Sequence, residues 1–118
     1  MVKVLWVSRH DMTKEQIEDL ERITGDSVEI TKFDKTCTSA FEILKKVEEH
    51  SILAVVLPVE LLSDLMQLKP EDVPILISKN ARKRNSDGEY VFTHDRWVKV
   101  DYCVYSSHEL EPYELQLN

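Results

Sequence analysis

Apolar and polar positions in the first part of the chain predict a strand, a helix and a second strand. Val4–Val7 is a short apolar run that is typical of a buried strand. Thr13 and Gln16 then have the spacing of a capping box, in which each side chain bonds the backbone N–H of the other. Gly25 is placed to end the helix that follows, and Val28–Phe33 alternates as a strand near a sheet edge does. These residues predict a β-α-β unit.

The middle of the chain repeats this order. A second capping box, Ser39 with Glu42, begins a helix whose apolar positions are helically spaced: Ala40, Ile43, Leu44 and Val47. Ile52–Leu57 is continuously apolar, which is typical of a parallel strand that is covered on both faces. A short third helix carries its own apolar positions: Leu61, Leu62, Leu65 and Met66. Ile75–Ile77 then predicts a fourth strand.

The pattern changes after the fourth strand. Asp87 and Gly88 are a turn signal between 81–86 and 89–94, so we expect a β-hairpin there. A long last strand is predicted by spaced apolar and aromatic residues: Trp97, Val98, Val100, Tyr102 and Val104. We therefore place a hairpin extension at about 81–105 and an acidic surface tail at about 106–118.

The order of these elements predicts one α/β domain over residues 1–118. Strands that alternate with helices form mostly parallel sheets, with helices on both faces. The expected fold is a small Rossmann-like or flavodoxin-like three-layer sandwich with a C-terminal β-hairpin extension. A chain of 118 residues has the usual length for one hydrophobic core.

Charge and hydropathy narrow the classes of partner. The formal net charge of −7, from 22 acidic and 15 basic residues, disfavours long nucleic acids. No apolar run approaches the roughly 20 residues of a membrane-spanning helix, and the signal-peptide pattern is missing, so we expect a cytoplasmic protein. Basic residues gather in one short segment: Lys79, Arg82, Lys83 and Arg84. This segment favours a compact anionic ligand, although a solvated basic loop explains it equally well.

Several common cofactor and metal sites are excluded by residue type. The two glycines, Gly25 and Gly88, lie outside the strand-to-helix turns, so the dinucleotide fingerprint and the P-loop are both missing. Cys37 and Cys103 are too few for a zinc site. The four histidines share no spacing of metal ligands. We expect neither a metal nor a cofactor.

Polar residues that follow the first and fourth strands are the candidate site. In doubly wound sheets, ligands bind beyond the carboxyl ends of the strands. The first group contains Ser8, Arg9, His10 and Thr13. The second group contains Ser78, Lys79, Asn80, Arg82, Lys83 and Arg84. Arginine donates paired hydrogen bonds to phosphate, and histidine exchanges protons near neutral pH. Together these residues predict a phosphate site with acid–base chemistry.

Each candidate residue also has a structural explanation. Arg9 pairs with Asp11 or with a helix carboxylate under this alternative, and His10 is a surface loop residue. Thr13 is a helix cap in either case. The segment His94–Arg96 supplies a second acid–base group or forms a turn between strands.

The segment Leu5-Trp6-Val7-Ser8-Arg9-His10 resembles certain accessory proteins of type III CRISPR systems. In these small stand-alone relatives of the CRISPR-associated Rossmann-fold (CARF) sensors, Ser/Thr-Arg-His follows the first strand. The resemblance implies a homodimer that binds cyclic oligoadenylate across its two-fold axis. Some members are ring nucleases that linearise this messenger and end the antiviral defence response.

The resemblance also implies a chemistry without a metal. The ribose 2′-hydroxyl attacks the adjacent phosphate, Arg9 stabilises the charged transition state, and His10 acts as general acid or base. Lys79 and Arg82 hold neighbouring phosphates. Two alternatives stay open: a module that senses or sequesters the cyclic nucleotide without cleaving it, and a protein-interaction domain.

Overall fold

Five strands form a single sheet in the order β2-β1-β3-β4-β5. The computed structural model describes residues 1–36 and 38–115, so Cys37 and the last residues of the predicted tail, 116–118, lie outside the described residues. The strands are β1 (Val2–Val7), β2 (Val28–Phe33), β3 (Ile52–Val55), β4 (Ile75–Arg84) and β5 (Tyr90–Lys99). The helices are α1 (Lys14–Thr24), α2 (Ala40–Leu44), the 3₁₀ turn η1 (Val47–Glu49) and α3 (Val59–Leu68). The first four strands are parallel and β5 is antiparallel to β4, which confirms the predicted α/β class.

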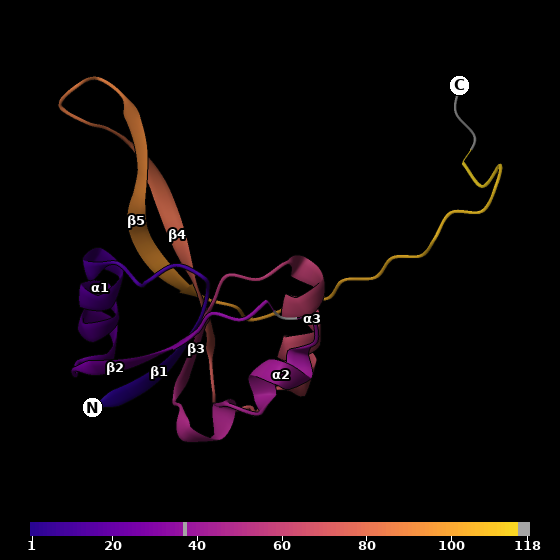
Figure 1. Cartoon of the computed structure of the whole chain (residues 1–118), viewed down its shortest axis with the longest axis horizontal. Helices are drawn as coiled ribbons and strands as arrows, with labels where there is room; N and C mark the ends of the chain where they lie inside the picture. Colours follow the sequence, from indigo (N-terminus) through magenta and orange to yellow (C-terminus); the bar gives the residue numbers. More distant parts are fainter. Residues whose placement is uncertain (37, 116–118) are drawn as a thin grey trace.

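Helices cover both faces of the sheet because β1 and β3 are apolar on both sides. Val4 and Trp6 lie in one buried cluster with Leu20 of α1. Leu5 and Val7 lie in the other cluster, with residues of α2 and α3. Figure 1 shows α1 on one side of the sheet and α2 and α3 on the other. Loops from both faces of the sheet therefore meet at the ends of the central strands.

The capping box predicted for the first helix is confirmed. The Oγ1 atom of Thr13 accepts a hydrogen bond from the Gln16 N–H at 3.2 Å. The Thr13 N–H donates to Oε1 of Gln16 at 2.8 Å. Gly25 ends the helix at a φ of 70°, in the left-handed region that glycine adopts without strain. The side chain of Gln16 is therefore fixed by the start of its own helix.

The second helix is shorter than the sequence predicts. α2 ends at Leu44, and Val47 lies in the separate turn η1, where it is 2% exposed. The chain leaves the helical path so that Val47 reaches the core just before β3. Ser39 caps α2 through its Oγ atom, but Glu42 accepts from Thr38 instead of closing the box. None of the helices in the described ranges is long and apolar enough to cross a membrane.

The fourth strand is longer than the sequence predicts. The prediction ended it at Ile77, whereas β4 continues to Arg84 and pairs with β5 along this length. The basic segment 79–84 is therefore strand rather than loop. Because the backbone pairing with β5 supplies the hydrogen bonds, these strand residues need no apolar pattern. The two strands project from the sheet as a ribbon (Figure 1).

The long last strand predicted after Trp97 ends early. β5 stops at Lys99, and residues 100–115 contain neither helix nor strand. Val100 and Cys103 still pack against the core, and the Tyr105 N–H donates to the buried Oγ of Ser63 at 3.0 Å. Beyond this point the chain leaves the body of the protein (Figure 1).

Candidate functional site

Two cavities open where β1 and β3 end. One has a volume of about 300 Å³ and reaches the segment after β2, through Lys35 and Thr36. The other has a volume of about 350 Å³ and reaches β4. Four residues line both cavities: Ser8, His10, Val56 and Leu57. The chain continues from β1 to a helix on one face and from β3 to a helix on the other, and this divergence opens a crevice between neighbouring strands.

Arg9 lies in the first of these cavities. Its guanidinium donates a hydrogen bond to Oγ1 of Thr36, and the side chain is exposed. The predicted pairing of Arg9 with Asp11 is not seen, because the Asp11 carboxylate bonds Nζ of Lys32 at 2.9 Å. This ion pair lowers the pKa of Asp11 through a direct hydrogen bond and the charge of the ammonium group. Arg9 therefore faces a hydroxyl group rather than a carboxylate.

His10 and Ser8 form a tight turn after β1. The His10 N–H donates to Oγ of Ser8 at 3.1 Å, and the His10 carbonyl accepts from Nε1 of Trp6 at 2.7 Å. These backbone contacts fix the position from which the exposed imidazole reaches both cavities. Thr13 lines the second cavity while it caps α1, so its two roles are compatible.

The predicted residues on β4 divide into two groups. Ser78 and Asn80 line the second cavity with His10. The Arg82 guanidinium lies 3.7 Å from the centre of the Tyr90 ring, and that of Arg84 lies 5.5 Å from it, out on the ribbon. Lys79 follows Ser78 directly, which places it on the opposite face of the strand. The expected meeting of Arg9 with the basic segment is wrong, because, of the two cavities, Arg9 lines only the first and the β4 residues Ser78 and Asn80 line only the second.

A bulge in β5 brings His94 and Trp97 to the same face of the strand. Lys79 pairs with Arg96 while Asn80 pairs with His94, so Asp95 is the extra residue. Without the bulge, His94 and Trp97 would point to opposite faces of the strand. With it, both reach α1: His94 contacts Asp19, and Trp97 Nε1 donates to the Gln16 carbonyl at 3.0 Å. The interpretation of His94–Arg96 as a turn is wrong.

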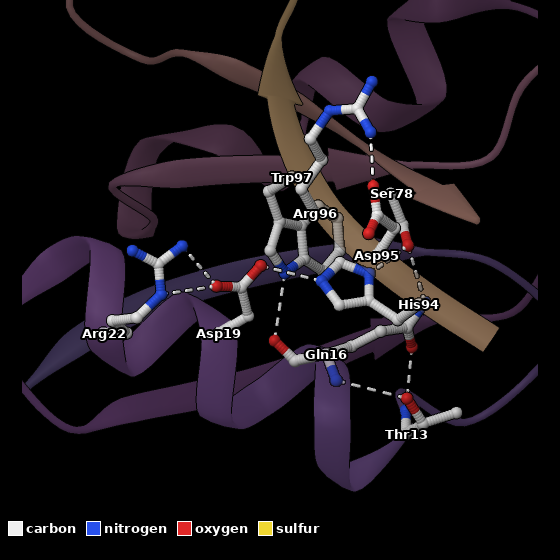
Figure 2. A network of polar contacts seen from close by, with 9 residues as sticks. All are labelled: Thr13, Gln16, Asp19, Arg22, Ser78, His94, Asp95, Arg96 and Trp97. Atoms are coloured by element: carbon white, nitrogen blue, oxygen red, sulfur yellow. Dashed lines mark hydrogen bonds and ion pairs between the residues drawn. The ribbon is translucent and has the colours of Figure 1, made fainter. Parts of the chain in front are cut away.

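Ser78, which lines the second cavity, begins a continuous chain of hydrogen bonds through His94 to Asp19 (Figure 2). Oγ of Ser78 lies 2.6 Å from Nδ1 of His94, and Nε2 of His94 lies 2.8 Å from Oδ2 of Asp19. Arg22 binds the other carboxylate oxygen of Asp19 at 2.7 Å. The His94 side chain is 4% exposed, so the centre of this chain of hydrogen bonds is shielded from water.

The capping box fixes the orientation of the Gln16 amide. A backbone N–H only donates, so the amide oxygen of Gln16 must face Thr13 and its Nε2 must face Ser78, at 3.2 Å. Ser78 therefore accepts from Gln16 and keeps its own proton for donation to Nδ1 of His94. With the imidazole proton on Nε2 and donated to the carboxylate of Asp19, every group in this arrangement has a partner.

Asp19 keeps its negative charge at this half-buried position. Burial by itself raises the pKa of the Asp19 carboxyl, but the hydrogen bonds from His94 and Arg22 outweigh this effect, and the pKa lies below its usual value. A carboxylate with a lowered pKa stabilises the folded state above its ordinary pKa of 3.8, and this contribution is lost as the pH falls below that value.

We expect Asp19→Asn to lower the free energy of unfolding at pH 7 by about 1–3 kcal/mol, because His94 and Arg22 lose a charged acceptor. Urea unfolding of both proteins at pH 7 and at pH 3 measures this difference, which should shrink at the lower pH. Asp11→Asn is the control, because Asp11 also has a lowered pKa but its side chain is 90% exposed. A difference that is equal at both pH values would contradict the assigned charge.

The predicted site did not include Gln16 and Asp19, although the sequence contains a signal for them. Gln16 and Asp19 are three residues apart on a helix, so they share one face with the buried Leu20 nearby. Polar side chains on the inner face of an amphipathic helix require partners. The partners themselves, on β4 and β5, depend on the bulge and were not predictable from spacing.

Among residues 1–36 and 38–115, no three or more His, Cys, Asp or Glu side chains gather where they could hold a metal ion. The groups that line the two cavities and are able to bind or move protons are the hydroxyl, imidazole and guanidinium groups described above, with the ammonium group of Lys35 in the first cavity and the carboxylate of Asp11 in the second. Comparison with known protein families, with characterised proteins and with solved structures gave no match to this chain.

Proposed function

We propose that this chain binds a cyclic oligoadenylate at the two cavities and cleaves it without a metal. The observation that carries the proposal is the placement of Ser8, Arg9 and His10 at the carboxyl ends of β1 and β3. The strand order is that of flavodoxin-like sheets, which bind ligands at this edge. We accordingly propose a small Rossmann-like domain that acts in the cytoplasm as a homodimer in antiviral defence.

The contacts of Arg9 suit a phosphate. Its planar guanidinium has five N–H donors, and one of them is used by Thr36. The remaining donors are able to bind two phosphate oxygens in parallel. The start of α1 contributes less than its position suggests, since the capping box already uses the N–H groups of Thr13 and Gln16. Arg9 and Lys35 thus supply positive charge to the first cavity, and Arg9 is the one with a planar group that suits two phosphate oxygens.

The cleavage step needs one proton to leave the attacking group and another to reach the leaving group. The ribose 2′-oxygen forms a bond to the neighbouring phosphorus, and the bond from phosphorus to the 5′-oxygen breaks. The products are a 2′,3′-cyclic phosphate and a 5′-hydroxyl. We assign charge stabilisation to Arg9 and protonation of the 5′-oxygen to His10.

A second candidate function is a protein-interaction domain. It is favoured by exposed aromatic side chains on the segment after β5, where Tyr102 is 81% exposed and Tyr113 is 97% exposed. Large exposed apolar groups of this kind mark contact surfaces for other proteins when they are contiguous. This function leaves the two cavities without a ligand.

Incubation of the protein with cyclic tetra-adenylate and cyclic hexa-adenylate, followed by chromatography, tests these functions. Linear products support the ring nuclease, and retention without turnover supports a sensor or a sequestering module. If neither ligand is bound or changed, the proposal is wrong and the interaction domain is favoured. Light scattering with and without ligand measures whether the active species is a dimer.

Arg9→Gln is expected to weaken binding of the cyclic ligand by about 10- to 100-fold, the effect of losing hydrogen bonds to a charged group. Calorimetric titration measures the change. Lys69→Gln removes the same charge at the C-terminal end of α3, whereas the cavity residues Pro58 and Leu61 lie at the start of that helix, and it should leave affinity unchanged. Equal affinity of the Arg9 variant and the unaltered protein would remove Arg9 from the site.

A further inference from the structure

The hydroxyl group of Ser78 connects the second cavity to a buried base. Ser78 lines that cavity together with Ser8 and His10. Behind it, Nδ1 of His94 lies 2.6 Å from the Ser78 oxygen. A hydroxyl group with an imidazole at hydrogen-bond distance, and a carboxylate on the other ring nitrogen, is the arrangement that activates serine in many enzymes. Ser78 therefore lies at one end of a proton pathway that opens into the second cavity.

Ser78 retains the capacity to bind one more donor. Its oxygen has two lone pairs, and the Gln16 amide uses one of them, while the Ser78 proton is directed to His94. The second lone pair is able to accept a hydrogen bond from a hydroxyl group of a ligand in the cavity. A 2′-hydroxyl bound there would lie one serine away from the imidazole.

We propose that Ser78 is a catalytic residue that takes the proton of the attacking 2′-hydroxyl and passes its own proton to His94. This proposal rests on the proposed function, since it names the proton acceptor of that reaction. As the 2′-oxygen bonds to phosphorus, its proton moves to Oγ of Ser78 and the Ser78 proton moves to Nδ1 of His94. The 5′-oxygen leaves with a proton from His10. Water returns both imidazoles to their starting forms, so protons balance.

His94 and Asp19 are positioning residues in this scheme, because they act through Ser78. Asp19 fixes the His94 ring and stabilises the imidazolium ion that forms, and Arg22 holds the Asp19 carboxylate in place. Other charged groups near the ring are Glu15 and Lys83, which line a cavity with His94, and the adjacent Asp95 and Arg96. The first two have opposite charges, as do Asp95 and Arg96, and Asp19 is the carboxylate in direct contact with the ring.

Single-turnover cleavage of the cyclic oligoadenylate by the whole protein, measured across pH, tests the relay. Ser78→Ala should lower the rate by about 100-fold or more, and Ser78→Thr should restore most of it because it keeps the hydroxyl group. The relay requires an Nδ1 on His94 that can accept a proton, so the rate in the unaltered protein should rise with pH on the acid side. His94→Gln should abolish this rise.

A purely structural role for the chain gives a different result. In that case, replacing Ser78 or His94 would lower the stability and the fraction of active protein, but it would leave the shape of the pH profile unchanged. A Ser78→Ala rate within about threefold of the unaltered rate, or a His94→Gln variant that keeps the rise with pH, would overturn the relay while the proposed function stands. If the unaltered protein does not cleave the ligand, both proposals fail together.

Discussion

Replacing His10 by alanine is expected to lower the rate of cyclic oligoadenylate cleavage by about 100- to 10,000-fold, the usual contribution of a positioned general acid. Binding should change little, since the Arg9 guanidinium is untouched. The turn that carries His10 should also survive, because it is held by the His10 backbone: the N–H bonds Ser8 and the carbonyl bonds Trp6. Rapid-quench kinetics and calorimetric titration measure the two effects separately.

The control for this experiment is another histidine that is exposed but far from the cavities. His108→Ala serves this purpose, because His108 lies on the segment after β5 and contacts Glu114. It should have the rate and affinity of the unaltered protein. Unchanged turnover in His10→Ala would remove His10 from the mechanism. A loss of affinity instead of rate would make it a ligand contact.

Local signals predicted the first half of the fold well. The capping box of Thr13 and Gln16 and the glycine after α1 depend on residues that are close together in the sequence. The apolar run at 52–57 predicted β3, but the strand ends at Val55, and Val56 is 63% exposed where it lines both cavities. The ends of α2 and β4 were wrong for the opposite reason. Val47 lies outside α2 because its side chain is buried in the core. β4 continues to Arg84 because β5 supplies its hydrogen-bond partners.

The candidate site also has one part that local sequence predicts and one part that depends on contacts between distant residues. Ser8, Arg9 and His10 follow β1 directly, so their place at the sheet edge follows from the order of the elements. The chain from Ser78 to Asp19 joins residues that are distant in sequence, and 75 positions separate His94 from Asp19. Its geometry depends on the bulge at Asp95, and no periodic pattern of residues predicts that bulge.

The bulge has an energetic role as well as a geometric one, because it turns a tryptophan into the core. Trp97 is 7% exposed, and its ring packs edge-on against Trp6 at 6.0 Å between centres. Its Nε1 bonds the Gln16 carbonyl, so one side chain ties β5 to both β1 and α1. Loss of this side chain should therefore loosen the wall of the second cavity and the sheet together.

Trp97→Ala is expected to lower the free energy of unfolding by about 3–5 kcal/mol, the range for removing a buried tryptophan. This is a large share of the total stability of an ordinary domain, about 5–15 kcal/mol, so Tm should fall by roughly 10 °C or more. Trp97→Phe should retain most of the packing.

Phe92→Ala is the matched control on β5, because Phe92 is 73% exposed and its removal should shift stability by less than about 0.5 kcal/mol. Circular dichroism in urea measures all three, and equal effects of Trp97→Ala and Phe92→Ala would mean that the bulge does not direct Trp97 into the core.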